Sequence, residues 1–122
     1  MINIKKLKRS VKYAGKGIVL VFKTEQNFRI QSLSLLLVAI AAFYFKLKTW
    51  ESVAVILASV IVLVLELINA SFERMIDAVI PRMNDYVKDI KDIMAATVLI
   101  ASVAALIIGI LIFLPYIMDI RV

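Results

Sequence analysis

Three apolar runs and one amphipathic segment organise this chain. Residues 30–45, 50–72 and 93–118 consist mainly of apolar side chains, and runs of this kind predict helices that cross a membrane. Residues 1–29 differ, because apolar side chains recur there at steps of three and four with Lys and Arg on the other faces: Ile4, Leu7, Val11, Ala14, Ile18 and Val21. This pattern predicts an amphipathic helix in the headgroup layer of the membrane.

The connections between these segments are short and polar. The first turn lies between Tyr44 and Trp50, which are side chains typical of a membrane interface. Residues 73–92 are predicted to be a cytoplasmic extension of the second helix followed by a loop, because Pro81 should end the helix. The expected fold is an all-α membrane protein in which residues 1–122 form one domain, a surface helix followed by three transmembrane helices.

The composition supports the membrane class. Of the 122 residues, 63% are hydrophobic, and the mean hydropathy is +0.97, well above that of a soluble domain. Three spans have too little interior to surround a polar site, so an oligomer is expected. The chain contains neither Cys nor His, which excludes disulfides and thiolate metal sites and removes the commonest general base and zinc ligand.

The net charge of +6 is unevenly distributed. Eight of the fifteen basic residues precede the first apolar run, two lie between the first and second, four lie between the second and third, and one follows the third. This is the positive-inside pattern, and it places the N-terminus and residues 73–92 on the cytoplasmic side. The distribution therefore favours a membrane protein over a protein that binds nucleic acid.

A polar stripe runs along the second span and its extension. Glu66, Asn69, Glu73 and Asp77 recur at helical spacing, and at about 100° per residue they project within roughly an 80° arc. Glu73 and Asp77 alone could belong to a helix end exposed to water. Glu66 lies among apolar residues 63–68, and a carboxylate at membrane depth is costly, so it indicates a functional site.

Further charged residues are predicted to face the same interface: Glu25, Lys91 and Asp92. Oxygen ligands without His or Cys favour Mg²⁺ over zinc, a Lys can neutralise phosphate charge, and a partly buried Glu can act as a base toward a hydroxyl. These are the parts of a phosphoryl-transfer site. From the residues alone, a cation-coupled carrier stays open, although a carrier would place its ionisable groups near the bilayer midplane.

The same residues carry a family resemblance. The chain resembles the prokaryotic membrane diacylglycerol kinases and undecaprenol kinases in Glu66-Leu-Ile-Asn-Ala-Ser-Phe-Glu73, in Asp77, and in the Lys91-Asp92 pair that follows fourteen residues later. Upstream, the similar positions are Tyr13, Lys16-Gly17 and the Glu25-x-Asn-x-Arg29-Ile patch. The last patch is more similar to the undecaprenol branch, and the likeness covers nearly the whole chain.

The resemblance implies a homotrimer with active sites between protomers, in which ATP phosphorylates a lipid alcohol at the cytoplasmic face of the bacterial inner (plasma) membrane. It implies Glu25 and Glu73 as ligands of the Mg²⁺ of MgATP. Glu66 would be the base for the lipid hydroxyl, and Asn69 would orient phosphate or base. The implied nucleotide contacts are Tyr13, Glu25, Glu73, Asp77, Lys91 and Asp92.

The chain departs from the family pattern in three places. Asn69-Ala-Ser-Phe72 replaces the usual Asn-(Ser/Thr)-Ala-Ile, Met83-Asn84 stands where Tyr-His is usual, and Gln31 stands where His is frequent. None of these changes removes a proposed metal ligand. Undecaprenol and diacylglycerol both stay open as substrates. The alternative interpretation is a non-catalytic small membrane protein, such as a cation-binding transporter subunit or a degenerate family member.

Overall fold

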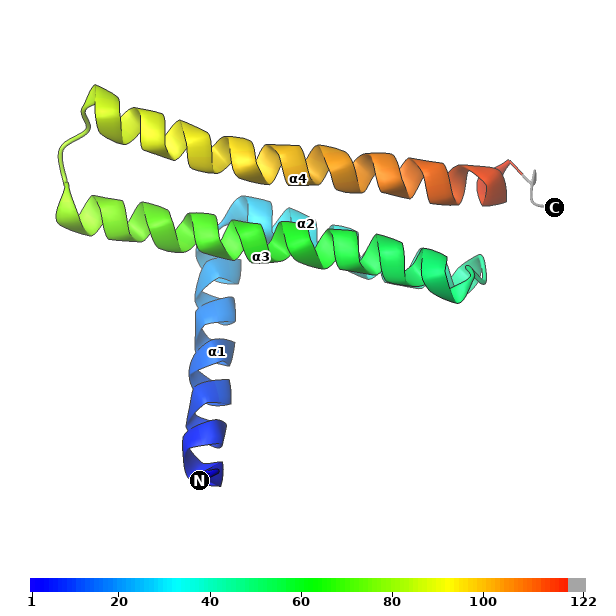
Figure 1. Ribbon diagram of the computed structural model, residues 1–122, viewed down its shortest axis with the longest axis horizontal. Coiled ribbons are helices and arrows are strands. Elements are labelled where there is room, and N and C mark those ends of the chain that lie inside the picture. The colour runs from blue at the N-terminus through cyan, green and yellow to red at the C-terminus, as the bar shows by residue number, and fades with distance from the viewer. Residues whose placement is uncertain (119–122) are drawn as a thin grey trace.

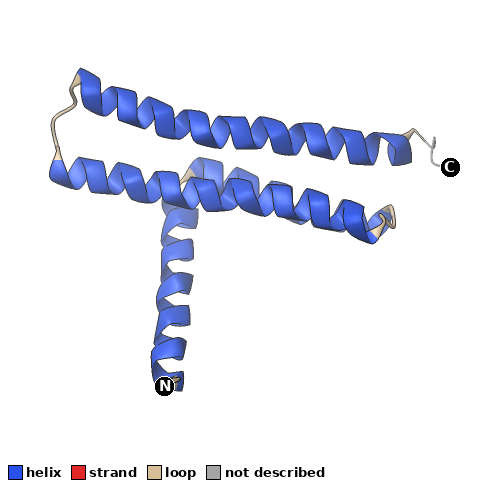
Figure 2. Ribbon diagram, viewed as in Figure 1, coloured by secondary structure: helices blue, strands red, loops and turns tan. Residues whose placement is uncertain are grey.

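The computed structural model describes residues 1–118, which form helices joined by short connections (Figure 1). In chain order the helices are α1 (Ile4–Thr24), α2 (Gln26–Tyr44), α3 (Thr49–Val79) and α4 (Asp85–Ile117). Figure 2 shows that the described residues contain no strand. Three helices, α2, α3 and α4, are long and apolar enough to cross a membrane. The prediction of an all-α fold with three membrane-spanning helices is therefore confirmed.

The central helix of the membrane-spanning layer is α3. It packs against both α2 and α4, whereas α2 and α4 do not pack against each other within residues 1–118. Its buried residues Val55, Val62, Glu66 and Ala70 recur at steps of four and seven, so they lie along one face. The three helices form an open layer rather than a closed bundle, and much of their apolar surface stays exposed.

The first helix runs across this layer instead of along it (Figure 1). It is attached at its C-terminal end, where Val21 packs with Phe28 of α2 and Ala70 of α3. The guanidinium of Arg29 donates hydrogen bonds of 2.8 and 3.0 Å to two carbonyl oxygens in the last turn of α1. Because such terminal carbonyls have no partner inside their own helix, Arg29 fixes the corner between α1 and α2.

Helix lengths locate the membrane boundary. α2 has 19 residues and therefore extends about 28 Å, close to the hydrocarbon thickness of a bilayer. α1 meets the layer beside Ala70, and we call this height the surface level. α3 continues to Val79, about 13 Å beyond it. The end of α3 and the start of α4 thus project beyond α1, on the side away from the lipid.

At the opposite end of the layer lies a buried carboxylate. Glu51 is 8% exposed and accepts hydrogen bonds from the backbone N–H of Lys48 and from the hydroxyl of Tyr116 near the end of α4. The preceding turn contains Lys46 in the left-handed region, at φ 53°. These hydrogen bonds join the α2–α3 turn to the C-terminal end of α4.

The fourth helix begins earlier than the sequence pattern predicts. A loop is expected through residues 82–92, yet α4 starts at Asp85. The Asn84 side chain caps the helix by accepting a hydrogen bond from the backbone N–H of Val87 (2.9 Å). Lys88 and Asp92 then form an ion pair at i,i+4 spacing (2.9 Å). These local interactions make the charged segment helical although it is not apolar.

Candidate active site

The Glu66 carboxylate lies on the central helix and is 2% exposed. Gln31, on α2, lies beside it, and the Glu25 and Glu73 carboxylates lie near enough to interact with it electrostatically. Glu66 precedes Ala70 by one helical turn, so it lies on the lipid side of the surface level. The structure therefore brings three of the predicted carboxylates together around the corner between α1 and α2.

Two of these carboxylates, Glu25 and Glu73, come from different elements. Glu25 is the single residue between α1 and α2, whereas Glu73 lies two turns beyond Glu66 on α3. Within residues 1–118 no three acidic or His side chains are arranged to hold one metal ion. A pair of carboxylates does fit Mg²⁺, which commonly uses one or two carboxylates and completes its shell with water and substrate phosphates.

Arg74 joins α3 to the same corner. Its guanidinium lies 3.6 Å from the Glu25 carboxylate and donates hydrogen bonds to the Thr24 hydroxyl (2.7 Å) and the Ala70 carbonyl oxygen (3.3 Å). Arg74 thus supplies the counter-charge for Glu25 in this structure. Sequence reasoning missed this residue, and its only signal was a positive charge directly after Glu73.

Two buried oxygens near Glu66 lack a partner. Neither Asn69 Oδ1 nor Gln31 Oε1 has a hydrogen-bond partner within residues 1–118. Asn69 follows Glu66 by three positions and so shares its face of α3, while Gln31 lies beside Glu66 on α2. Since buried acceptors are normally satisfied, this group suits a molecule that donates a hydroxyl hydrogen. Sequence reasoning treated Gln31 only as a departure from the family pattern.

An ion pair connects the projecting ends of α3 and α4. Lys91 Nζ lies 2.7 Å from Asp77 Oδ1, and the two residues meet because the chain reverses between the helices. Asp92 instead pairs with Lys88 on its own helix. Asp77 lies two turns beyond Ala70, so this cation and these carboxylates face the aqueous side of the surface level.

Tyr13 is not brought close to these groups in one chain. It precedes Glu25 by twelve residues and therefore lies about 18 Å away along α1. Its side chain is exposed, and the Lys16 ammonium lies 5.8 Å from the centre of its ring. Of the predicted site residues, Tyr13 is the one that the fold places apart.

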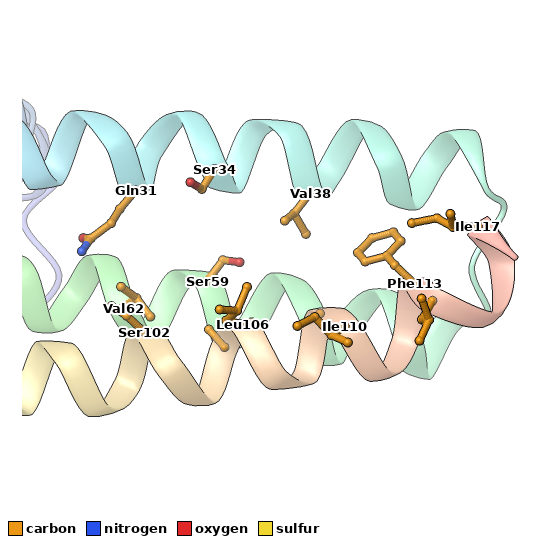
Figure 3. Close-up of a pocket in the computed structure, with 13 residues that line it drawn as sticks. Gln31, Ser34, Val38, Ser59, Val62, Ser102, Leu106, Ile110, Phe113 and Ile117 are labelled. Atoms are coloured by element: carbon orange, nitrogen blue, oxygen red, sulfur yellow. The ribbon is translucent and has the colours of Figure 1, made fainter.

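An apolar groove of about 410 Å³ is lined by α2, α3 and α4. Figure 3 shows Gln31 toward one end, Phe113 toward the other, and Ser34 and Ser59 between them. Both serine hydroxyls donate to carbonyl oxygens of their own helices, so apart from the Gln31 amide the lining offers little to a polar ligand. Because the lining includes Val62, one helical turn before Glu66 on the same face of α3, the groove leads from the apolar interior of the layer toward the buried carboxylate.

Known proteins share this sequence pattern. The profile of the prokaryotic diacylglycerol kinase family matches residues 12–113. The chain is similar to the diacylglycerol kinase of Synechocystis sp., with 32% identity over 114 residues that make up 93% of this chain and 65% of that protein. It is also similar to the undecaprenol kinase of Bacillus subtilis, with 33% identity over 107 residues, 88% of this chain and 87% of that protein. It thus spans about two thirds of the first relative's length.

Proposed function

The chain belongs to the prokaryotic diacylglycerol kinase family, and on that premise we propose that it is an ATP-dependent lipid kinase. The γ-phosphoryl group of MgATP is transferred to the hydroxyl of a lipid alcohol at the cytoplasmic face of the bacterial plasma membrane. The two relatives are named for undecaprenol and for diacylglycerol, and the proposal covers either lipid as the acceptor.

The observation that carries the proposal is the height of the polar stripe relative to the membrane. Glu66 lies on the lipid side of the surface level, and the Asp77–Lys91 pair lies on its aqueous side. A lipid hydroxyl can approach Glu66 from the bilayer, whereas a charged nucleotide can approach Lys91 from water. A cation carrier would instead need its ionisable groups near the bilayer midplane.

In this proposal Glu66 is the general base. The lipid hydroxyl donates a hydrogen bond to the Glu66 carboxylate and passes its proton there as the lipid oxygen bonds to the γ-phosphorus. The bond between that phosphorus and the β,γ-bridging oxygen breaks, and ADP leaves. Asn69, whose Oδ1 has no partner within residues 1–118, would hold the hydroxyl or the phosphoryl group in position.

The remaining predicted residues would bind the nucleotide and its metal ion. Glu25 and Glu73 would hold Mg²⁺, which when bound neutralises charge on the β- and γ-phosphates. Lys91 would contact the phosphates as a point cation, with Asp77 holding its ammonium in place. Asp92 would line the pocket beside it. Tyr13, about 18 Å from Glu25 along α1, would be a further nucleotide contact.

We also propose that the chain acts as a homotrimer with the site completed between protomers. Within residues 1–118, α3 is the one helix that packs against α4, and the groove beside α2 stays open. Because a polar site in lipid must be enclosed by protein or lead to water, neighbouring copies would supply the missing wall. The N-terminus would be cytoplasmic, in agreement with the positive-inside distribution.

A phosphorylation assay with two lipids tests the proposal. Full-length protein in bilayers should transfer label from γ-labelled ATP to undecaprenol or diacylglycerol, and Mg²⁺ removal should stop the transfer. Glu73→Gln should lower the rate by about a hundredfold or more. Asp89→Asn, which removes an exposed acid outside the stripe, is the matched control. Wild-type activity no higher than that of Glu73→Gln with both lipids would overturn the proposal and leave a non-catalytic family member.

A further inference from the structure

We propose that the exposed surface of α1 binds anionic phospholipids. The surface consists of an apolar stripe and a row of basic side chains beside it. The proposal concerns the bilayer on which the protein sits and does not depend on the kinase reaction.

All of the net positive charge of the chain lies on α1. Residues 1–24 contain seven basic and no acidic residues (+7), whereas residues 25–122 contain eight basic and nine acidic residues (−1), which together give the net charge of +6. None of the seven cations forms a salt bridge within residues 1–118. The charge of α1 is therefore not neutralised by the described part of its own chain.

An apolar stripe runs along α1 within an arc of about 60°. Its side chains are 46–65% exposed, and they are Ile4, Leu7, Val11, Ile18 and Phe22. Six of the seven cations project from a neighbouring arc of about 100°, namely Lys5, Lys8, Arg9, Lys12, Lys16 and Lys23. This arrangement lets the stripe enter the acyl boundary while long Lys stems reach the phosphate groups.

The direction of α1 agrees with this seating. The helix crosses the membrane-spanning layer at the surface level (Figure 1), so it lies along the bilayer surface when α2, α3 and α4 span the membrane. A second copy of the chain fits this surface less well. Each α1 helix carries seven cations that are not neutralised, so two of these helices brought together would repel each other. A soluble anion such as a nucleotide would leave the apolar stripe unexplained. An anionic bilayer surface can bury the apolar stripe and also attract the cations through its phosphate groups.

The absence of Cys from the sequence permits a direct test with single cysteines. Val11→Cys probes the stripe, and Leu20→Cys, on the opposite side of α1 and also exposed, is the matched control. Each full-length variant is placed in bilayers of phosphatidylcholine, or of phosphatidylcholine with phosphatidylglycerol, and labelled with a membrane-impermeant maleimide. We expect Val11→Cys to react about tenfold more slowly in the anionic bilayer, and Leu20→Cys to react equally in both.

Two further arms separate charge recognition from simple burial. Salt at about 1 M, where the Debye length is about 3 Å, should restore fast labelling of Val11→Cys. Replacing Lys5, Lys12 and Lys16 by Gln in the Val11→Cys background should do the same at low salt, and Lys46→Gln with Lys48→Gln is the control. A labelling rate of Val11→Cys that does not depend on lipid charge would overturn the proposal. Slow labelling in both bilayers would indicate that another protomer covers the residue, and fast labelling in both would indicate that the residue is not buried. Kinase activity does not enter any of these readouts.

Discussion

Replacing Arg74 by Gln is expected to lower the Mg²⁺ concentration that half-activates the proposed phosphoryl transfer. The Arg74 guanidinium lies 3.6 Å from the Glu25 carboxylate, and the two side chains are 42% and 28% exposed. A Mg²⁺ ion that binds Glu25 must displace this counter-charge. Removing the guanidinium therefore removes a competitor and leaves the proposed ligand free.

Solvent screening sets the size of the effect. Two unit charges 3.6 Å apart attract by about 4–5 kcal/mol at an effective dielectric constant of about 20. Ion pairs between exposed side chains contribute only about 0.2–1 kcal/mol when measured, and the exposure of both partners here favours that lower range. Up to about 1 kcal/mol of competition corresponds to about a fivefold change in metal affinity. We expect the Mg²⁺ requirement to fall by about two- to fivefold.

Two measurements check this expectation. The first is the Mg²⁺ dependence of phosphorylation at saturating ATP, and the second is Mn²⁺ binding to the protein, followed by electron paramagnetic resonance. Arg74→Lys keeps the positive charge and should stay close to wild type in both. Arg82→Gln removes another exposed cation at the same end of the protein and should change neither. A higher metal requirement in Arg74→Gln would refute the competition and indicate that Arg74 assists phosphate or metal binding.

Three other substitutions probe separate parts of the molecule. Glu66→Gln keeps the shape of the side chain but removes the proposed base, so kcat should fall by about 10²–10⁴-fold with the KM for MgATP unchanged; an unaltered kcat would contradict the assignment. Tyr116→Phe removes the hydroxyl that donates to buried Glu51 and should lower the free energy of unfolding by about 1–2 kcal/mol in denaturation experiments, while kcat stays unchanged because the contact lies at the far end of the layer. Ser59→Leu narrows the groove that leads to Glu66 and should raise the KM for the lipid alone, so an equal rise in the KM for ATP would speak against the groove as the lipid path.

The membrane spans are predictable because lipid acts on each helix separately. A helix in a bilayer satisfies its own backbone hydrogen bonds, so hydropathy alone locates α2, α3 and α4. The polar stripe is predictable for a similar reason, since helical spacing alone places Glu66, Asn69 and Glu73 on one face. The start of α4 at Asp85 escapes this reasoning, because its first turns are charged and are ordered by the Asn84 cap.

Contacts between elements are not fixed by any local pattern. The approach of Arg74 to Glu25 depends on the direction in which α1 leaves the layer, and that direction follows from the packing of Val21 on Ala70. The Asp77–Lys91 ion pair was not predicted, because the family resemblance relates the two positions only by their spacing in the sequence. The reversal between α3 and α4 places two residues fourteen positions apart within hydrogen-bonding distance.

The position of Tyr13 links the two proposals. A nucleotide whose phosphates lie near Glu25 cannot bring its γ-phosphate to Tyr13, because about 18 Å of α1 separates the two residues. Tyr13 can therefore meet only the end of the nucleotide that carries the base. On the helix, Tyr13 projects about 150° away from the centre of the apolar stripe, so an α1 seated on the bilayer turns the Tyr13 ring toward water. If anionic lipid holds α1 in that seating, it also holds the aromatic ring on the side from which ATP arrives.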